Sequence, residues 1–278
     1  MSVERDQKKF FDDYAARSQQ QAAAVHTFFA ELATAEIRRG FSWLADRRAV
    51  LDYGCGTGRT IELFLDTTGA RPERIIGIDL SDVSIDVARH RLPFEFHVVS
   101  DDDLGFIPAA SLDGAYMVYV LHHTGEHQKI FDQVARVLQP GGRFFVIDLT
   151  LHNPIIESAR AVFPYMPSRV KHMFPDDLVI DDTIPEKLPV EVDETIERLC
   201  RAGFHVEGTE YGHLAYFVFD WLERLTRLPL SHTRFKAMYV ALYRFEKRLL
   251  RFGFFQRRAH VFAVRAVKLG PTPAAQPN

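Results

Sequence analysis

The stretch VLDYGCGTGRT at residues 50–60 decides how this chain folds. An apolar run ends at Asp52, and glycines follow at every second position, Gly54, Gly56 and Gly58. Glycine is needed where the backbone takes a positive φ or lets a ligand approach closely, because a Cβ would clash there. The turn then opens a helix, whose free N–H groups favour a carboxylate or a phosphate. The stretch therefore predicts a cofactor-binding turn between a strand and a helix at the head of an α/β sheet.

The spacing of the glycines separates this turn from the dinucleotide-binding type. That fingerprint, G-x-G-x-x-G/A, places its third small residue three positions after the second. Here the order is Asp-x-Gly-x-Gly-x-Gly, and Arg59 stands at the diagnostic position. The pattern resembles the first motif of the Rossmann-like S-adenosylmethionine (SAM)-dependent methyltransferases.

A second motif follows at the expected distance. The segment RIIGIDLS at residues 74–81 reads as an apolar strand that ends at Asp79, 21 residues after Gly58. An acidic residue about 20 positions after a glycine turn suits hydrogen bonds to ribose hydroxyls. Ser81 is predicted to be the N-cap of the next helix.

Three later segments resemble further motifs of the same family, in the same order. FHVVSDDDLGF at 96–106 resembles the end of the third strand, where Asp101 would meet the adenine amine and Asp102 would contribute backbone. LDGAYMVYVLHHT at 112–124 resembles the fourth strand, and VLQPGGRFFVID at 137–148 resembles the turn into the fifth.

The resemblance covers about residues 48–150 and departs from the family at two positions. Ser100 stands where the family more often has Gly, and Gln139 replaces a basic residue. The resemblance implies SAM as the cofactor and S-adenosylhomocysteine as the product. The cofactor-binding residues that it implies are Tyr14, Asp52, Gly54, Gly56, Asp79, Leu80, Asp101, Asp102 and Met117.

The composition is that of an ordinary globular protein. The chain has 278 residues, 47% of them apolar, and a net charge of −3, so nothing global suggests nucleic acid. The two cysteines, Cys55 and Cys200, lie far apart, which argues against a disulfide framework or a zinc site. With no transmembrane run and no apolar signal segment, we expect a cytoplasmic enzyme.

The expected fold is a Rossmann-like, three-layer α/β sandwich with a mostly parallel seven-stranded sheet whose last strand is antiparallel. We expect a helical cap at 1–47, a SAM-binding core at 48–150, an acceptor-side insertion at 151–189, completion of the core at 190–212 and 259–269, a helical insertion at 213–258 and a disordered tail at 270–278. The segment FFDDYAARSQ in the cap resembles a helix that closes over the methionine end of the cofactor in small-molecule methyltransferases. Phe11 and Tyr14 would then lie near the sulfonium, or would simply pack the helix onto the sheet.

The insertion at 213–258 has an unusual composition. It holds ten Lys or Arg against three Asp or Glu, and eleven of the 34 aromatic residues. Phe235, Tyr239 and Tyr243 share one helical face. The insertion could be a lid that packs this face on the sheet, a site for an anionic acceptor, a contact with an anionic membrane surface, or a homodimer contact. Nucleic acid is disfavoured, because the rest of the chain is acidic.

Histidines after the fourth and fifth strands are the candidates for a general base. Methyl transfer needs an aligned nucleophile, and a hydroxyl acceptor gains from a base such as His. We predict His123 as the base, with His152 as the second candidate; both could instead be loop residues. His122 would point the opposite way in an extended run, and Asp148 could orient a partner. No metal-binding constellation is evident.

These features predict methyl transfer from SAM to a small-molecule acceptor, at a hydroxyl oxygen of a metabolite, sugar or natural product. Carbon or nitrogen methylation of a metabolite or a lipid-linked molecule is an alternative, which would tolerate loss of the histidines after the fourth strand if the acceptor needs no protein base. A second alternative is a non-catalytic SAM-binding protein that docks a partner through residues 213–258. The two insertions carry no motif that chooses the acceptor.

Overall fold

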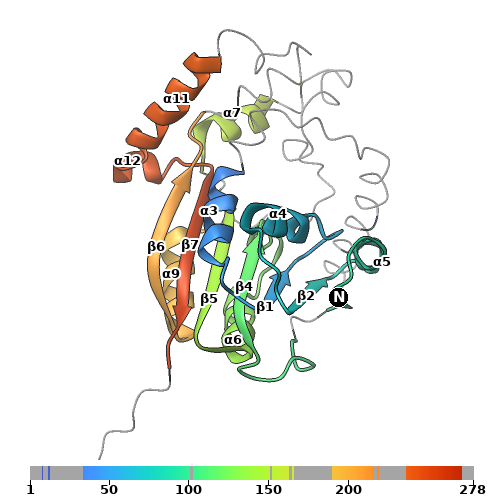
Figure 1. Ribbon diagram of the computed structural model, residues 1–278. Helices are drawn as coiled ribbons and strands as arrows, with labels where there is room; N and C mark the ends of the chain where they lie inside the picture. Colours follow the sequence, from blue (N-terminus) through green and yellow to red (C-terminus); the bar gives the residue numbers. More distant parts are fainter. Residues whose placement is uncertain are drawn as a thin grey trace, which may run out of the picture.

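A seven-stranded sheet forms the centre of the molecule (Figure 1). The computed structural model describes residues 34–100, 103–150, 152–162, 190–215 and 236–270, together with Lys8, Asp12, Tyr165 and Val218. The strand order is β3-β2-β1-β4-β5-β7-β6. The strands are β1 (Ala49–Tyr53), β2 (Arg74–Asp79), β3 (Glu95–Val98), β4 (Leu112–Val118), β5 (Leu138–Leu149), β6 (Phe204–Gly212) and β7 (Val261–Lys268).

The pairing confirms the predicted fold class. β1 to β5 pair in parallel, whereas β7 runs antiparallel to both of its neighbours, β5 and β6. The carboxyl ends of the parallel strands therefore meet at one edge of the sheet, where ligands of open α/β sheets bind. The central strands are buried on both faces, which explains why their sequences are continuous apolar runs rather than alternating ones.

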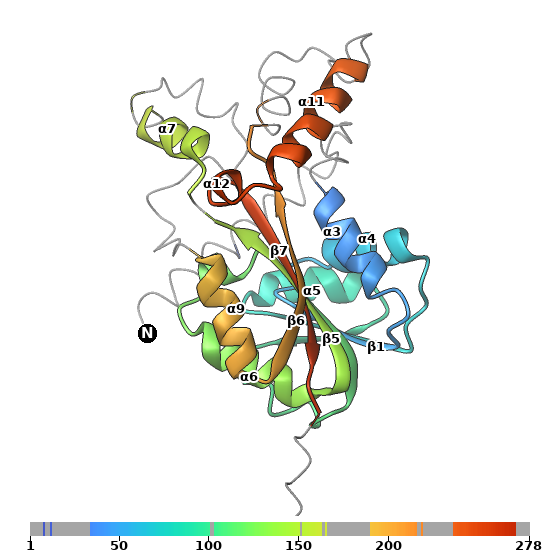
Figure 2. The ribbon, with the colours of Figure 1, turned by 90° about the vertical axis from the view of Figure 1, so that its left-hand side faces the viewer.

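Helices cover both faces of the sheet (Figure 2). α6 and α9 pack on one face around Phe131, Phe144 and Phe204. α3 and α4 pack on the other, where Phe41 and Phe64 make an edge-to-face contact with 5.3 Å between their ring centroids. The helices are α3 (Ala35–Trp43), α4 (Arg59–Thr68), α5 (Asp82–Arg91), the 3-10 turn η1 (Leu121–His123), α6 (His127–Val137), α7 (Pro154–Val162), α9 (Val192–Arg201), α11 (Lys236–Leu249) and α12 (Gly253–Gln256).

Local signals in the sequence set several of these boundaries. Ser81 is the N-cap of α5, as predicted, because its hydroxyl accepts a hydrogen bond from the Ser84 N–H at 3.0 Å. The chain leaves α9 through Gly203, whose φ of 88° a residue with a Cβ rarely adopts.

Three helices lie beyond the carboxyl edge of the sheet, namely α7, α11 and α12 (Figures 1 and 2). The prolines of the segment 151–189 favour irregular structure, but its described part begins with the helix α7. Asn153 caps this helix, since its Oδ1 accepts a hydrogen bond from the Ile155 N–H at 3.0 Å. The limits of the insertions remain predictions, and the tail 271–278, Trp221 and Phe235 lie outside the described residues.

The part of the chain that the structure describes contains no helix that is both long enough and apolar enough to span a bilayer.

Candidate functional site

The glycine turn joins the end of β1 to the start of α4. Gly54, Gly56 and Gly58 all have positive φ, at 79°, 49° and 82°. A Cβ on Gly54 would meet Val120 Cγ2 at 2.3 Å, so the loop after β4 packs directly against this residue. A Cβ on Gly56 would meet nothing within 4 Å. Of these two predicted cofactor residues, Gly54 is required by packing, whereas Gly56 faces open space that a cofactor can enter.

Asp79 connects the turn to the end of β2. Its Oδ2 accepts a hydrogen bond from the Gly56 N–H at 2.8 Å, and its Oδ1 accepts one from the Ser81 N–H at 2.9 Å. Burial raises the pKa of Asp79, against the effect of these backbone donors. A carboxylate has about four lone-pair positions, so the predicted ribose hydroxyls can still bind. Leu80 lies beside it, half-buried.

Asp52 lies at the bottom of the site and is fully buried. Its Oδ2 accepts hydrogen bonds from the Thr60 hydroxyl at 2.7 Å and the Tyr116 hydroxyl at 3.1 Å. Its Oδ1 has no hydrogen-bond partner among the described residues. Burial raises the pKa of Asp52 to about 7. A cationic ammonium would satisfy Oδ1 and restore the charge of the carboxylate, so this residue fits the amino group of SAM.

Two residues near the N-terminus lie beside the start of α5. The Ser81 hydroxyl donates to Asp12 Oδ1 at 2.5 Å, and Lys8 Nζ lies 2.6 Å from Asp82 Oδ1. Asp12, which belongs to the segment predicted to cover the cofactor, therefore contacts the chain just after the end of β2. Tyr14, Asp101 and Asp102 lie outside the described residues, and Met117 is fully buried in the core on β4.

The loop after β4 contains a buried His–Asp pair. His122 Nδ1 lies 2.5 Å from Asp148 Oδ1 at the end of β5, and both side chains are almost inaccessible to solvent. The Leu121 N–H donates to Asp148 Oδ2 at 2.6 Å and the Leu149 N–H donates to Oδ1 at 2.7 Å. Because the carboxylate only accepts, Nδ1 carries the proton and Nε2 is left as the basic nitrogen.

Sequence reasoning passed over His122 because it assumed that the extended run continues. Residues 121–123 instead form the 3-10 turn η1, in which successive side chains are about 120° apart rather than 180°. The rings of His122 and His123 therefore lie together, with 3.8 Å between their centroids. In the sequence, the position of Asp148 at the end of the fifth strand was the feature that indicated an orienting partner for a histidine. His127 supports the loop, since its Nε2 lies 2.9 Å from the carbonyls of Leu121 and Thr124.

His152, the second predicted base, lies apart from this pair. It precedes α7 and is 44% exposed, and its Nε2 lies 2.6 Å from Glu191 Oε1. Across the described residues, no three metal-ligating side chains come together.

Comparisons with known proteins agree with this geometry. A family model described as a methyltransferase domain matches residues 51–146. The chain is 32% identical to the O-methyltransferase cnsE of Penicillium expansum over 118 residues, which are 39% of this chain and 41% of that protein. It is 28% identical to the demethylmenaquinone methyltransferase of Tropheryma whipplei (strain Twist) over 173 residues, 60% of this chain and 70% of that protein.

A solved structure extends the agreement to most of the fold. The crystal structure of a SAM-dependent methyltransferase from Archaeoglobus fulgidus has a TM-score of 0.55 at 20% identity, and covers 86% of this chain and 94% of that one. The chain spans only about two fifths of the length of the first curated relatives that it matches. The glycine turn, the sheet order and these matches therefore give the chain the fold of the Rossmann-like (class I) SAM-dependent methyltransferases, with residues 51–146 matching the methyltransferase domain itself.

Proposed function

We propose that this protein transfers a methyl group from SAM to an oxygen atom of a small organic acceptor. The family supports SAM as the methyl donor, and the relative from Penicillium expansum is named an O-methyltransferase. Oxygen is favoured as the acceptor atom mainly by the His122–Asp148 pair in the loop after β4 and at the end of β5. A histidine that a carboxylate orients in this way can act as the general base that a hydroxyl acceptor requires.

The position of this pair supports the proposal. β1, β4 and β5 are neighbours in the sheet and run in parallel, so the turn with Gly56 and the loop with His122 lie at the same edge (Figure 1). The loop also touches the turn directly, because Val120 packs against Gly54. A base carried by this loop is therefore next to the open space above the glycine turn.

The chemistry requires little of the protein beyond alignment and a proton acceptor. SAM, when bound, supplies a methyl group that its sulfonium has already activated. The protein holds the acceptor hydroxyl in line, and His122 Nε2 accepts its proton. Asp148 keeps the imidazole in the required tautomer and stabilises the cation that forms. The buried carboxylate of Asp52 holds the amino end of the cofactor.

Methylation at carbon or nitrogen is the second candidate. The relative from Tropheryma whipplei, named a demethylmenaquinone methyltransferase, matches a larger part of this chain than the O-methyltransferase does. An acceptor of this kind needs no protein base, so the two candidates differ in what the loss of His122 does.

The test is a methylation assay with SAM and a panel of hydroxylated aromatic compounds and sugars, with the methylated atom identified by NMR. We expect His122→Asn to lower kcat by about 10²–10⁴ while SAM affinity is kept, and Asp148→Asn to shift the pH profile of kcat. The exposed His205 on β6 provides the control variant His205→Asn, which should act like wild type. Full turnover by His122→Asn with the methyl on carbon or nitrogen would replace the oxygen proposal by the second candidate. Tight SAM binding without turnover of any acceptor would favour a binding protein.

A further inference from the structure

α11 and α12 lie beyond the carboxyl edge of the sheet (Figures 1 and 2), and both carry large apolar side chains that are exposed to solvent. Met238, Leu242 and Phe245 follow one another at helical spacing along α11, and Phe252 and Phe254 are the next large exposed apolar side chains in the chain, at the start of α12. These five side chains are between 41% and 64% exposed. We call them the α11–α12 surface. Exposed apolar side chains gathered on one face, unlike single ones, indicate an interaction site.

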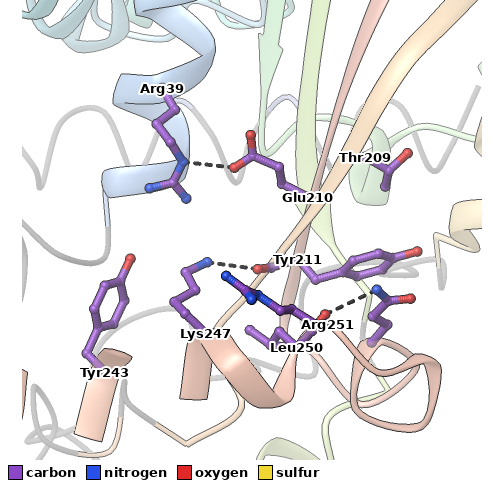
Figure 3. A pocket seen from close by; sticks show the side chains of 9 residues that line it. Arg39, Thr209, Glu210, Tyr211, Tyr243, Lys247, Leu250 and Arg251 are labelled. Atoms are coloured by element: carbon purple, nitrogen blue, oxygen red, sulfur yellow. Dashed lines mark hydrogen bonds and ion pairs between the residues drawn. The ribbon is translucent and has the colours of Figure 1, made fainter. Parts of the chain in front are cut away.

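The opposite face of α11 already anchors the helix to the body of the protein. Tyr239, Glu246 and Leu250 are buried, and Glu246 Oε2 accepts a hydrogen bond from the Ala215 N–H at 2.8 Å. Lys247 forms an ion pair with the buried Glu36 of α3 and donates to the Tyr211 carbonyl at 2.8 Å. Figure 3 shows this side of α11 against β6, across an open pocket of about 440 Å³. The contacts that anchor α11 among the described residues therefore come from the face opposite the α11–α12 surface.

Arginines border this surface. Arg244 and Arg248 are exposed and lie on one flank of the apolar stripe of α11, at helical positions adjacent to it, and Arg251 is exposed just after the helix ends. Arg257 and Arg258 are exposed beside α12, where the Arg258 guanidinium lies 3.9 Å from the ring centroid of Phe254. Residues 236–258 contain seven Lys or Arg and one acidic residue, Glu246, which is buried. The chain as a whole has a net charge of −3, so the positive charge is local to this region.

We propose that the α11–α12 surface binds an anionic lipid bilayer in its plane. Apolar side chains along one stripe enter the boundary between headgroups and acyl chains, and basic side chains on the flank meet anionic headgroups. A second copy of the chain fits less well, because a two-fold dimer would place this surface against itself and bring its arginines together. If the proposed function holds, docking also turns the acceptor side of the sheet toward the bilayer.

The test is co-sedimentation of the full chain with vesicles of phosphatidylcholine alone and of phosphatidylcholine with phosphatidylserine, at low and high salt. We expect binding to the anionic vesicles only, and weaker binding at high salt. The variant Arg244→Gln/Arg248→Gln and the variant Phe245→Ser/Phe254→Ser should each lower the affinity about tenfold or more. All of these side chains are exposed, so the thermal unfolding of both variants should match wild type.

Matched controls come from exposed residues elsewhere. Arg48→Gln/Arg201→Gln removes the same charge and Leu269→Ser removes an exposed apolar side chain, and neither should change vesicle binding. The proposal is overturned if wild type does not bind the anionic vesicles, if the control variants lose as much affinity, or if the surface variants instead dissociate a dimer. Vesicle binding is measured in an assay that does not involve methyl transfer. A failure of the membrane proposal can therefore be distinguished from a failure of the proposed methyltransferase function.

Discussion

Gly54 and Gly56 stand two positions apart in one turn, but different neighbours make them necessary. Val120 Cγ2 occupies the place of a Cβ on Gly54, whereas the place of a Cβ on Gly56 is empty. The first glycine lets two loops of the protein pack, and the second leaves room for a ligand. The motif in the sequence contains both requirements without distinguishing them.

We predict that Gly56→Val abolishes SAM binding while the protein still folds. The left-handed φ of 49° costs a residue with a Cβ about 1–2 kcal/mol, but no neighbour obstructs it. Gly54→Ala, although smaller, should destabilise the fold more, because the contact with Val120 adds about 1–3 kcal/mol of overpacking. Calorimetric titration with SAM and chemical unfolding of both variants separate the two effects. Normal SAM binding by Gly56→Val would show that the cofactor site is misassigned.

The buried carboxyl of Asp52 should make stability depend on pH. Its folded-state pKa of about 7 lies above the ordinary value of about 3.9, so between these pH values the folded state keeps a proton that the unfolded chain has lost. Without cofactor, the free energy of unfolding therefore falls as the pH rises from about 4 to about 7, by up to about 4 kcal/mol. Asp52→Asn should reduce this slope and leave the part that comes from Asp79, whose pKa is also raised, and urea unfolding at pH 4, 5, 6, 7 and 8 would measure the difference. An unchanged slope in the variant would mean that Asp52 is not the titrating group.

At the scale of elements, a cluster around Glu36 joins α11 to α3. Burial opposes the charge of Glu36, but His213, Lys247 and Arg39 outweigh it and hold the pKa below its usual value. The stabilisation from this carboxylate is therefore present above the unfolded value of about 4.3 and is lost as the pH falls through the lower folded value. An ion cluster therefore takes part in holding the helix that carries the proposed membrane surface.

We predict that Glu36→Gln loosens α11 and leaves the sheet intact. Loss of the charged partner should cost about 1–3 kcal/mol, since Lys247 and Arg39 then keep their charges beside a neutral amide. Hydrogen exchange should become faster in residues 236–249 and stay unchanged in β1 and β4. The exposed Glu207 on β6 provides the control Glu207→Gln, which should leave exchange as it is. Equal loss of protection across the sheet would show that Glu36 supports the whole fold instead.

Element boundaries could be predicted where a local signal exists. Ser81 marks the start of α5, because an N-cap serine is a signal that the sequence alone carries. The turn η1 and the start of α7 were not predicted. A 3-10 turn of three residues is too short to show a periodicity in the sequence. The prolines of 151–189 favour irregular structure, so the short helix α7 could not be recognised.

For the molecule as a whole, the site exists because parallel strands bring distant segments to one edge. Asp52, Asp79, His122 and Asp148 come from four different strands or the loops that follow them. A cofactor that bridges these segments binds the folded state alone, so it should stabilise the entire protein. At a concentration about 100 times its dissociation constant, S-adenosylhomocysteine should add about 2.7 kcal/mol and raise Tm by about 5 °C. A Tm that stays constant, or that rises equally in Gly56→Val, would contradict this.

The sequence by itself determined the Rossmann-like methyltransferase fold, with its mostly parallel sheet and antiparallel last strand, because the motifs that indicate this fold are local and ordered along the chain. Tertiary structure alone decided that Asp148 meets His122, that Asp52 is buried with an unsatisfied oxygen, and that Met238, Leu242 and Phe245 face the solvent. Each of these depends on which elements pack together, and the contacts join residues far apart in the chain. Local propensity carries no information on such contacts, since the same helical stripe can face a core or the solvent.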